Sequence, residues 1–137
     1  MGSKWKIVLL FFMAILVFTG CASKKAGDID TKIYNLEQDF KKNYQLWVDM
    51  KADGAVQHKE YATDMKDVGN KFKSLGNSAK TTSYKKLLSD EDQKIYEGYR
   101  VLGDDIYKVG TALYKKDYTE ANKIYQSVLE KEEALKE

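Results

Sequence analysis

From Asp28 to the end of the chain, apolar residues recur at spacings of three and four, and never alternate with polar ones. A repeat of three and four residues is typical of an amphipathic helix, whereas a half-buried strand alternates with a period of two. The 137 residues include no proline, which interrupts helices and is frequent in turns. The pattern therefore predicts an all-α protein, and the length fits one domain.

The first two helical segments are bounded by capping and glycine signals. Asp28 or Asp30 can cap the start of the first segment, and Asp53 with Gly54 ends it. Gly76 is expected to stop the second segment, and the small polar stretch after it predicts a loop. The apolar positions of the first segment are Ile29, Ile33, Leu36, Phe40, Tyr44 and Trp47. Those of the second are His58, Tyr61, Met65, Val68, Phe72 and Leu75.

The last two segments both open with capping signals. Ser89 begins a sequence close to the capping box, and Asp117 precedes a similar start. A short helical turn is expected around Tyr84, between the second and third segments. The apolar positions of the third segment are Ile95, Tyr99, Leu102, Ile106, Val109 and Leu113. Those of the fourth are Tyr118, Ala121, Ile124 or Tyr125, Val128 and Leu135. Heptad spacing with short connections predicts a small antiparallel bundle of about four helices over residues 28–137.

The turn before the fourth segment carries a second sequence pattern in addition to its capping signal. The stretch from Tyr114 to Ala121, with Tyr125 four residues later, resembles the second half of a tetratricopeptide repeat. A single copy is present, whereas such repeats need about three copies to bury a core. The resemblance therefore implies a helical hairpin here, and no repeat array is expected.

The N-terminus has the order of a secretory signal. The first six residues carry two lysines and no acid, and residues 7–18 form an unbroken apolar run of twelve. A helix of twelve residues spans about 18 Å, which is less than the ~30 Å hydrocarbon core of a bilayer. The sequence Phe18, Thr19, Gly20 and Cys21 follows, and it resembles the lipobox of bacterial lipoprotein precursors. Phe18 departs from the leucine that is usual there.

The lipoprotein resemblance implies cleavage between Gly20 and Cys21 and a diacylglyceryl group on the Cys21 sulfur. Residues 1–20 would then be the signal peptide, and residues 21–27 a lipidated N-terminus with a short tether. The membrane, through this anchor, is the first expected partner, since two acyl chains hold a protein where one binds reversibly. The implied location is the extracytoplasmic face of the cell membrane, or the outer membrane if the cell has one.

Charge and composition argue against several functions. Removal of residues 1–20 takes Lys4 and Lys6 from 23 Lys and Arg residues and leaves 21, against 21 Asp and Glu. This balance gives no basic excess for nucleic acid, so none is expected as a partner. His58 is the only histidine, and with one cysteine no zinc site of the usual kind is expected. The adjacent acids Glu91-Asp92 and Asp104-Asp105 diverge on a helix. No enzymatic activity, metal or cofactor is therefore expected.

The tyrosines are the unusual feature of the composition, because they are numerous and clustered. Six of the ten tyrosines lie between Tyr96 and Tyr125. Arg100, Tyr107 and Tyr114 recur every seven residues beside the apolar row of the third segment. They either straddle the boundary between core and solvent or form an interaction surface, where Tyr and Arg are over-represented. On the opposite flank Tyr96 is followed by Gly103 and Gly110, which predicts a close approach by a neighbouring helix or by a partner.

The sequence thus predicts a membrane-anchored, non-enzymatic interaction module that binds an unidentified protein at the cell envelope. The alternative is an immunity or superinfection-exclusion lipoprotein that blocks phage DNA entry or a toxin at the membrane surface, where the partner would be the invading protein. Binding of a small ligand is a third possibility, although no cluster of polar residues suggests a pocket.

Overall fold

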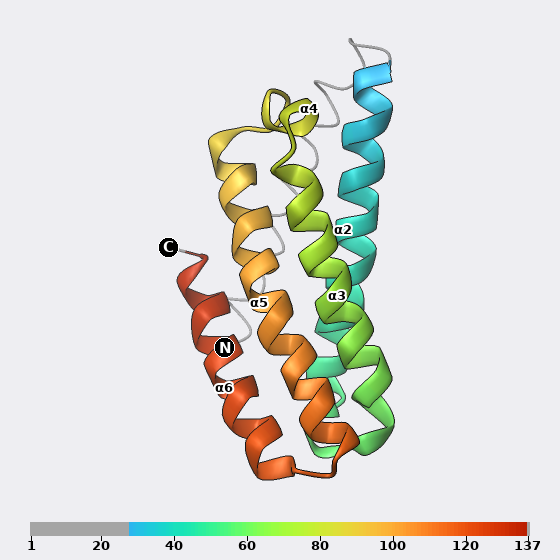
Figure 1. Ribbon diagram of the computed structural model, residues 1–137, viewed down its shortest axis with the longest axis vertical. Coiled ribbons are helices and arrows are strands. Elements are labelled where there is room, and N and C mark those ends of the chain that lie inside the picture. The colour runs from blue at the N-terminus through green and yellow to red at the C-terminus, as the bar shows by residue number, and fades with distance from the viewer. Residues whose placement is uncertain (1–27, 137) are drawn as a thin grey trace.

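The computed structural model describes residues 28–136, in which four long helices run alternately up and down (Figure 1). They are α2 (Asp28–Ala52), α3 (Ala62–Ala79), α5 (Asp90–Tyr114) and α6 (Tyr118–Ala134). The short helices η1 (Ala55–Gln57) and η2 (Lys59–Tyr61) join α2 to α3, and α4 (Thr82–Lys85) joins α3 to α5. Residues 28–136 contain no strand, so the predicted all-α bundle is confirmed. No helix in this part of the chain has both the length and the apolar character needed to cross a membrane.

The helix ends follow the predicted capping signals. The Ser89 hydroxyl accepts a hydrogen bond from the Asp92 backbone N–H at 3.1 Å, and the Asp117 carboxylate accepts one from the Glu120 N–H at 3.1 Å. Each cap satisfies a donor that the first turn of a helix leaves unpaired. Gly54 ends the first segment with φ of 67°, a conformation that glycine adopts without strain.

The predicted boundaries of the second segment are wrong. Gly76 lies inside α3, which continues to Ala79, and it packs against the Arg100 side chain of α5. His58 and Tyr61 precede α3, since His58 is the N-cap of η2 and Tyr61 is its last residue. A glycine after an apolar row has the same local signature whether it ends a helix or makes room for a neighbour.

Helices α3 and α5 touch backbone to backbone. A methyl group on Gly103 would lie 2.5 Å from the carbonyl oxygen of Gly69, and one on Gly69 would lie 2.6 Å from that of Gly103. Two turns further along α5, a methyl group on Gly110 would lie 2.7 Å from the carbonyl oxygen of Ala62. The close approach predicted at Gly103 and Gly110 is therefore made by the neighbouring helix α3.

Helix α2 packs through large rings. The ring centroid of Phe40 lies 5.0 Å from that of Tyr96, 5.3 Å from that of Tyr99 and 5.5 Å from that of Phe72. Trp47, two turns further along α2, is completely buried. These rings lie between α2 and the other helices, and they hold its backbone away from them.

Two apolar positions differ from the prediction. Tyr96 is buried, whereas Ile95, which was assigned to the core row, is only partly buried. Helix α5 contacts α3, α6 and the rings of α2, so its buried arc is wider than one heptad row. Tyr118 was expected in the core but is 40% exposed, since it begins α6 at the turn.

Candidate interaction surface

Tyr107 and Tyr114 lie exposed on the C-terminal half of α5, as their heptad spacing predicts. Tyr107 is 38% exposed and Tyr114 is 62% exposed. The backbone beneath them is rigid, because Gly110 lies between the two tyrosines on the chain and its face is pressed against α3. The rings therefore extend from a fixed helix rather than from a loop.

Lysines of the neighbouring segment cover these rings. The Lys66 ammonium lies 5.7 Å from the Tyr107 centroid and 5.0 Å from the Tyr114 centroid, and the Lys59 ammonium lies 5.5 Å from the Tyr114 centroid. A cation over a ring face within about 6 Å is attracted by the ring quadrupole. We call Lys59, Lys66, Tyr107 and Tyr114 the tyrosine–lysine surface.

Arg100 does not join this surface. Its guanidinium donates two hydrogen bonds to the Glu97 carboxylate, at 2.9 and 2.7 Å, and Lys80 lies 3.5 Å from the same carboxylate. The hydrogen bonds from Arg100 lower the pKa of Glu97 to about 2. Arg100 thus shares the predicted row on α5, but its charge is paired two turns away from Tyr107.

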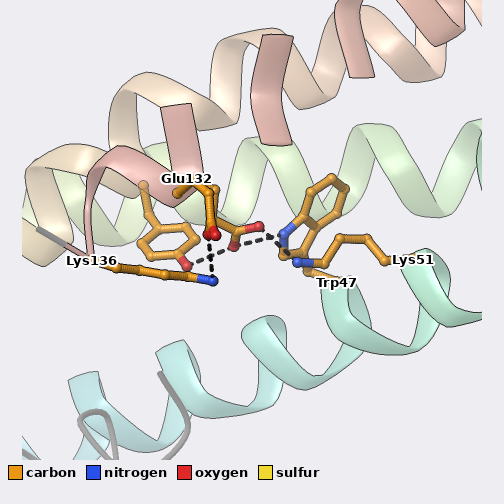
Figure 2. A network of polar contacts seen from close by, with 6 residues as sticks. Trp47, Lys51, Glu132 and Lys136 are labelled. Atoms are coloured by element: carbon orange, nitrogen blue, oxygen red, sulfur yellow. Dashed lines mark hydrogen bonds and ion pairs between the residues drawn. The ribbon is translucent and has the colours of Figure 1, made fainter. Parts of the chain in front are cut away.

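A buried carboxylate, which the sequence analysis missed, joins three helices (Figure 2). Glu132 of α6 accepts hydrogen bonds from the Trp47 indole N–H of α2 at 3.1 Å and the Tyr99 hydroxyl of α5 at 2.7 Å. Its other oxygen pairs with the Lys51 ammonium at 2.7 Å. Glu132 continues the spacing of Ala121, Val128 and Leu135, which is the signal that places it toward the core.

The pKa shifts around Glu132 follow from burial. Burial lowers the pKa of Lys51, while the charge of Glu132 acts in the opposite direction. Burial, together with the negative charge of Glu132, raises the pKa of Tyr99 well above its usual value. Tyr99 therefore stays protonated at neutral pH and donates to Glu132. The cluster is enclosed and fully paired, so its main effect is to hold α6 against α2 and α5.

Of the other ionisable groups singled out from the sequence, His58, Asp104 and Asp105 are solvated or paired. Asp92 is buried, and its Oδ1 accepts no hydrogen bond from the described residues. His58 is half exposed, with one ring nitrogen 3.9 Å from the Glu60 carboxylate. Asp104 pairs with Lys73 at 3.0 Å, and Asp105 pairs with Lys131 at 2.8 Å. Within residues 28–136, no three His, Cys, Asp or Glu side chains converge closely enough to hold a metal ion.

The proposed lipidation residue Cys21 and the adjoining Gly20 lie outside the described residues. Comparison with protein families, with curated proteins and with solved structures finds no match for this chain. The function must therefore be inferred from the chain's own residues. Among the described side chains, exposed aromatic residues on a fixed backbone are the feature best suited to binding a partner.

Proposed function

We propose that this protein is a lipid-anchored bacterial envelope protein that binds another protein through its tyrosine–lysine surface. The exposed pair Tyr107 and Tyr114, bridged by Lys66 on a rigid helix contact, is the observation that carries the proposal. Tyrosine supplies a large amphipathic contact area and loses little side-chain entropy on binding, because it has only two rotatable side-chain bonds.

An anchor at Cys21 would hold the bundle by the end at which α2 starts, opposite the end that carries the tyrosine–lysine surface. Helix α2 starts at Asp28 at one end of the molecule, and the turn between α5 and α6 lies at the other end (Figure 1). Tyr114 is the last residue of α5, whose 25 residues span about 37 Å. With a short tether before Asp28, the tyrosine–lysine surface would face away from the membrane, toward partners outside the cell.

The first experiment tests the surface. A photocrosslinking amino acid at position 107 or 114 should capture the same protein in living cells, whereas one at Tyr34, a 55% exposed tyrosine on α2, should not. Tyr107→Ala with Tyr114→Ala should reduce capture of that protein at least tenfold, since aromatic anchors dominate interface energetics. Tyr34→Ala is the matched control. Equal capture from all three positions, or loss of capture with Tyr34→Ala alone, would contradict the proposal.

The second experiment tests the anchor. Cys21→Ala should release the protein from washed membranes or leave it as an unprocessed precursor of lower mobility, because the thiol that accepts lipid is gone. Cys21→Ser is a second variant with nearly the same shape as the parent. A Cys21→Ala protein that is processed and membrane-bound like the parent would show that the anchor lies elsewhere.

A further inference from the structure

A groove separates α2 from α3 on the side of α3 that faces away from the glycine contact. It has a volume of about 610 Å³ and is open to solvent along one side. It exists because the rings of α2 hold the two backbones apart, whereas α3 and α5 touch. We call it the α2–α3 groove.

The middle of the α2–α3 groove is apolar. Leu46 of α2 is 52% exposed and lines the groove, with Met50 one turn further along the same helix. Val68 of α3 lies opposite, and its carbonyl oxygen accepts a hydrogen bond from the buried Asn43 amide at 3.1 Å. A half-exposed leucine between two helices offers a contact for another apolar side chain.

One half of the α2–α3 groove is strongly acidic. Asp49 lines it from α2 and Asp53 from the turn that follows α2, while Asp64 and Asp67 line it from α3. No cation among residues 28–136 forms an ion pair with any of the four, although Asp49 accepts from Gln45 and Asp53 from the Tyr61 hydroxyl. The proximity of Asp53 raises the pKa of Tyr61.

The other half of the α2–α3 groove has almost no net charge. Asp39 pairs with Lys71 at 3.9 Å across the groove, and Lys42 lines the same end. The surplus negative charge is therefore concentrated beside Leu46 and toward the turn that joins α2 to α3. Such a field attracts cations and raises their rate of encounter.

We propose that the α2–α3 groove binds a cationic amphipathic α-helix of a partner protein. An apolar row on that helix would pack on Leu46, and flanking Lys or Arg residues would pair with the four aspartates. The lining from Asp39 to Asp53 spans about 21 Å, which is the length of four helical turns. A helix in a groove is also the recognition mode that a helical bundle offers, because the described residues present no strand edge to extend.

Charge complementarity selects this occupant. An acidic segment would be repelled by the four aspartates, which have no ion-pair partner among residues 28–136, and an apolar segment without cations would leave their charge uncompensated. The α2–α3 groove is separate from the tyrosine–lysine surface, so this proposal goes beyond the function proposed above and can fail without it.

Binding is measured with a defined probe. The full-length protein is placed in nanodiscs of neutral phosphatidylcholine, and a labelled 18-residue peptide of Leu, Ala and Lys is titrated, with the leucines on one helical face. Empty nanodiscs give the lipid background. We expect saturable binding that weakens as salt rises, and at least tenfold weaker binding of a peptide with the same composition in scrambled order.

Substitutions then locate the site. Asp49→Asn with Asp67→Asn should weaken binding about fivefold, and Leu46→Ser about tenfold, with unchanged circular dichroism spectra. The control Glu91→Gln with Glu130→Gln removes the same charge from exposed positions elsewhere and should leave binding unchanged.

The proposal is overturned if the control weakens binding as much as the groove variants do, since that would be unspecific charge attraction. Equal binding of the scrambled peptide would overturn it as well. So would a photocrosslinker at position 46 that links two copies of this chain in living cells, since the α2–α3 groove would then be a dimer contact. Capture at positions 107 and 114 should be unaffected by all groove variants.

Discussion

The contacts that α5 makes with α3 and with α2 are built in opposite ways. Between α5 and α3, the backbones meet at Gly69 and Gly103, with no side chain between them. Between α5 and α2, the rings of Phe40, Tyr96 and Tyr99 keep the backbones apart. The first contact has no room for another atom, and the second depends on the volume of its side chains.

The difference explains where the molecule has surfaces for partners. The close contact of α3 and α5 lets Lys66 of one helix reach over Tyr107 and Tyr114 of the other. The ring-filled contact of α2 leaves the α2–α3 groove beside it, lined by Leu46. Both proposed binding surfaces therefore follow from how far apart the helices are held.

The largest expected effect is the loss of a ring from the α2 contact. Trp47→Ala should lower the free energy of unfolding by about 3–5 kcal/mol, because it opens a large cavity at a fully buried site. It also removes the indole N–H that donates to the buried Glu132. Urea denaturation followed by circular dichroism measures the change.

The neighbouring residue supplies the control for this prediction. Leu46→Ala shortens an exposed apolar side chain on the same helix and should cost less than about 0.5 kcal/mol. Similar losses for Trp47→Ala and Leu46→Ala would mean that α2 is not held by its buried rings.

The next effect comes from adding one atom to the glycine contact. In Gly103→Ala the new methyl group meets the backbone of Gly69, which cannot move without shifting α3. We expect a net loss of up to about 2 kcal/mol, since overpacking costs ~1–3 kcal/mol and the gain in helix propensity offsets about 1 kcal/mol of it. Thermal or urea denaturation measures it.

Gly98→Ala is the matched control on the same helix. Its methyl group would meet only the end of the Leu135 side chain, which can turn away. This variant should therefore be as stable as the parent or slightly more stable. If Gly98→Ala were the more damaging of the two, the contact between α3 and α5 would be looser than its geometry indicates.

The helices themselves could be predicted from the sequence. Spacings of three and four place most buried apolar residues of α2 and α5 correctly, because burial of one helical face leaves that period in the chain. Met50 of α2 is also buried and was not in the predicted row. Ser89 and Asp117 marked two helix starts, since the capping side chain and the N–H groups that it satisfies lie within one turn.

Features that depend on a contact with a distant segment of the chain could not be predicted from the sequence. Gly76 was interpreted as a helix end because its partner, Arg100, lies 24 residues away. Glu132 sits in a run of charged residues, and its core position is visible only from the spacing of its apolar neighbours. Lys66 could not be assigned to the tyrosines, because the register of α3 against α5 is set by contacts between glycines.

The smallest expected effect is a difference in how the stability of the two contacts, α3 with α5 and α2 with α5, depends on pH. At Gly69 and Gly103 the closest contacts are backbone atoms, which do not titrate, whereas burial raises the pKa of Tyr44, Tyr96 and Tyr99 in the rings facing α2. Above pH 10 these phenols ionise in the unfolded chain but keep their protons in the folded one. The unfolded state then binds fewer protons, so stability falls as the pH rises. The lowered pKa of Lys51 acts in the opposite direction, since it raises stability as the pH approaches the ordinary lysine value of 10.5, and this contribution levels off above that pH.

Tyr96→Phe tests this difference, because it removes one titrating phenol and keeps the ring. The variant should gain about 1 kcal/mol relative to the parent between pH 8 and pH 11, in urea denaturation at a series of pH values. Gly103→Ala should lower the stability by the same amount at every pH, since it changes a contact that carries no proton. A parent protein whose stability does not fall above pH 10 would show that the phenols facing α2 are solvated, and that the rings there are less closely packed than the centroid distances indicate.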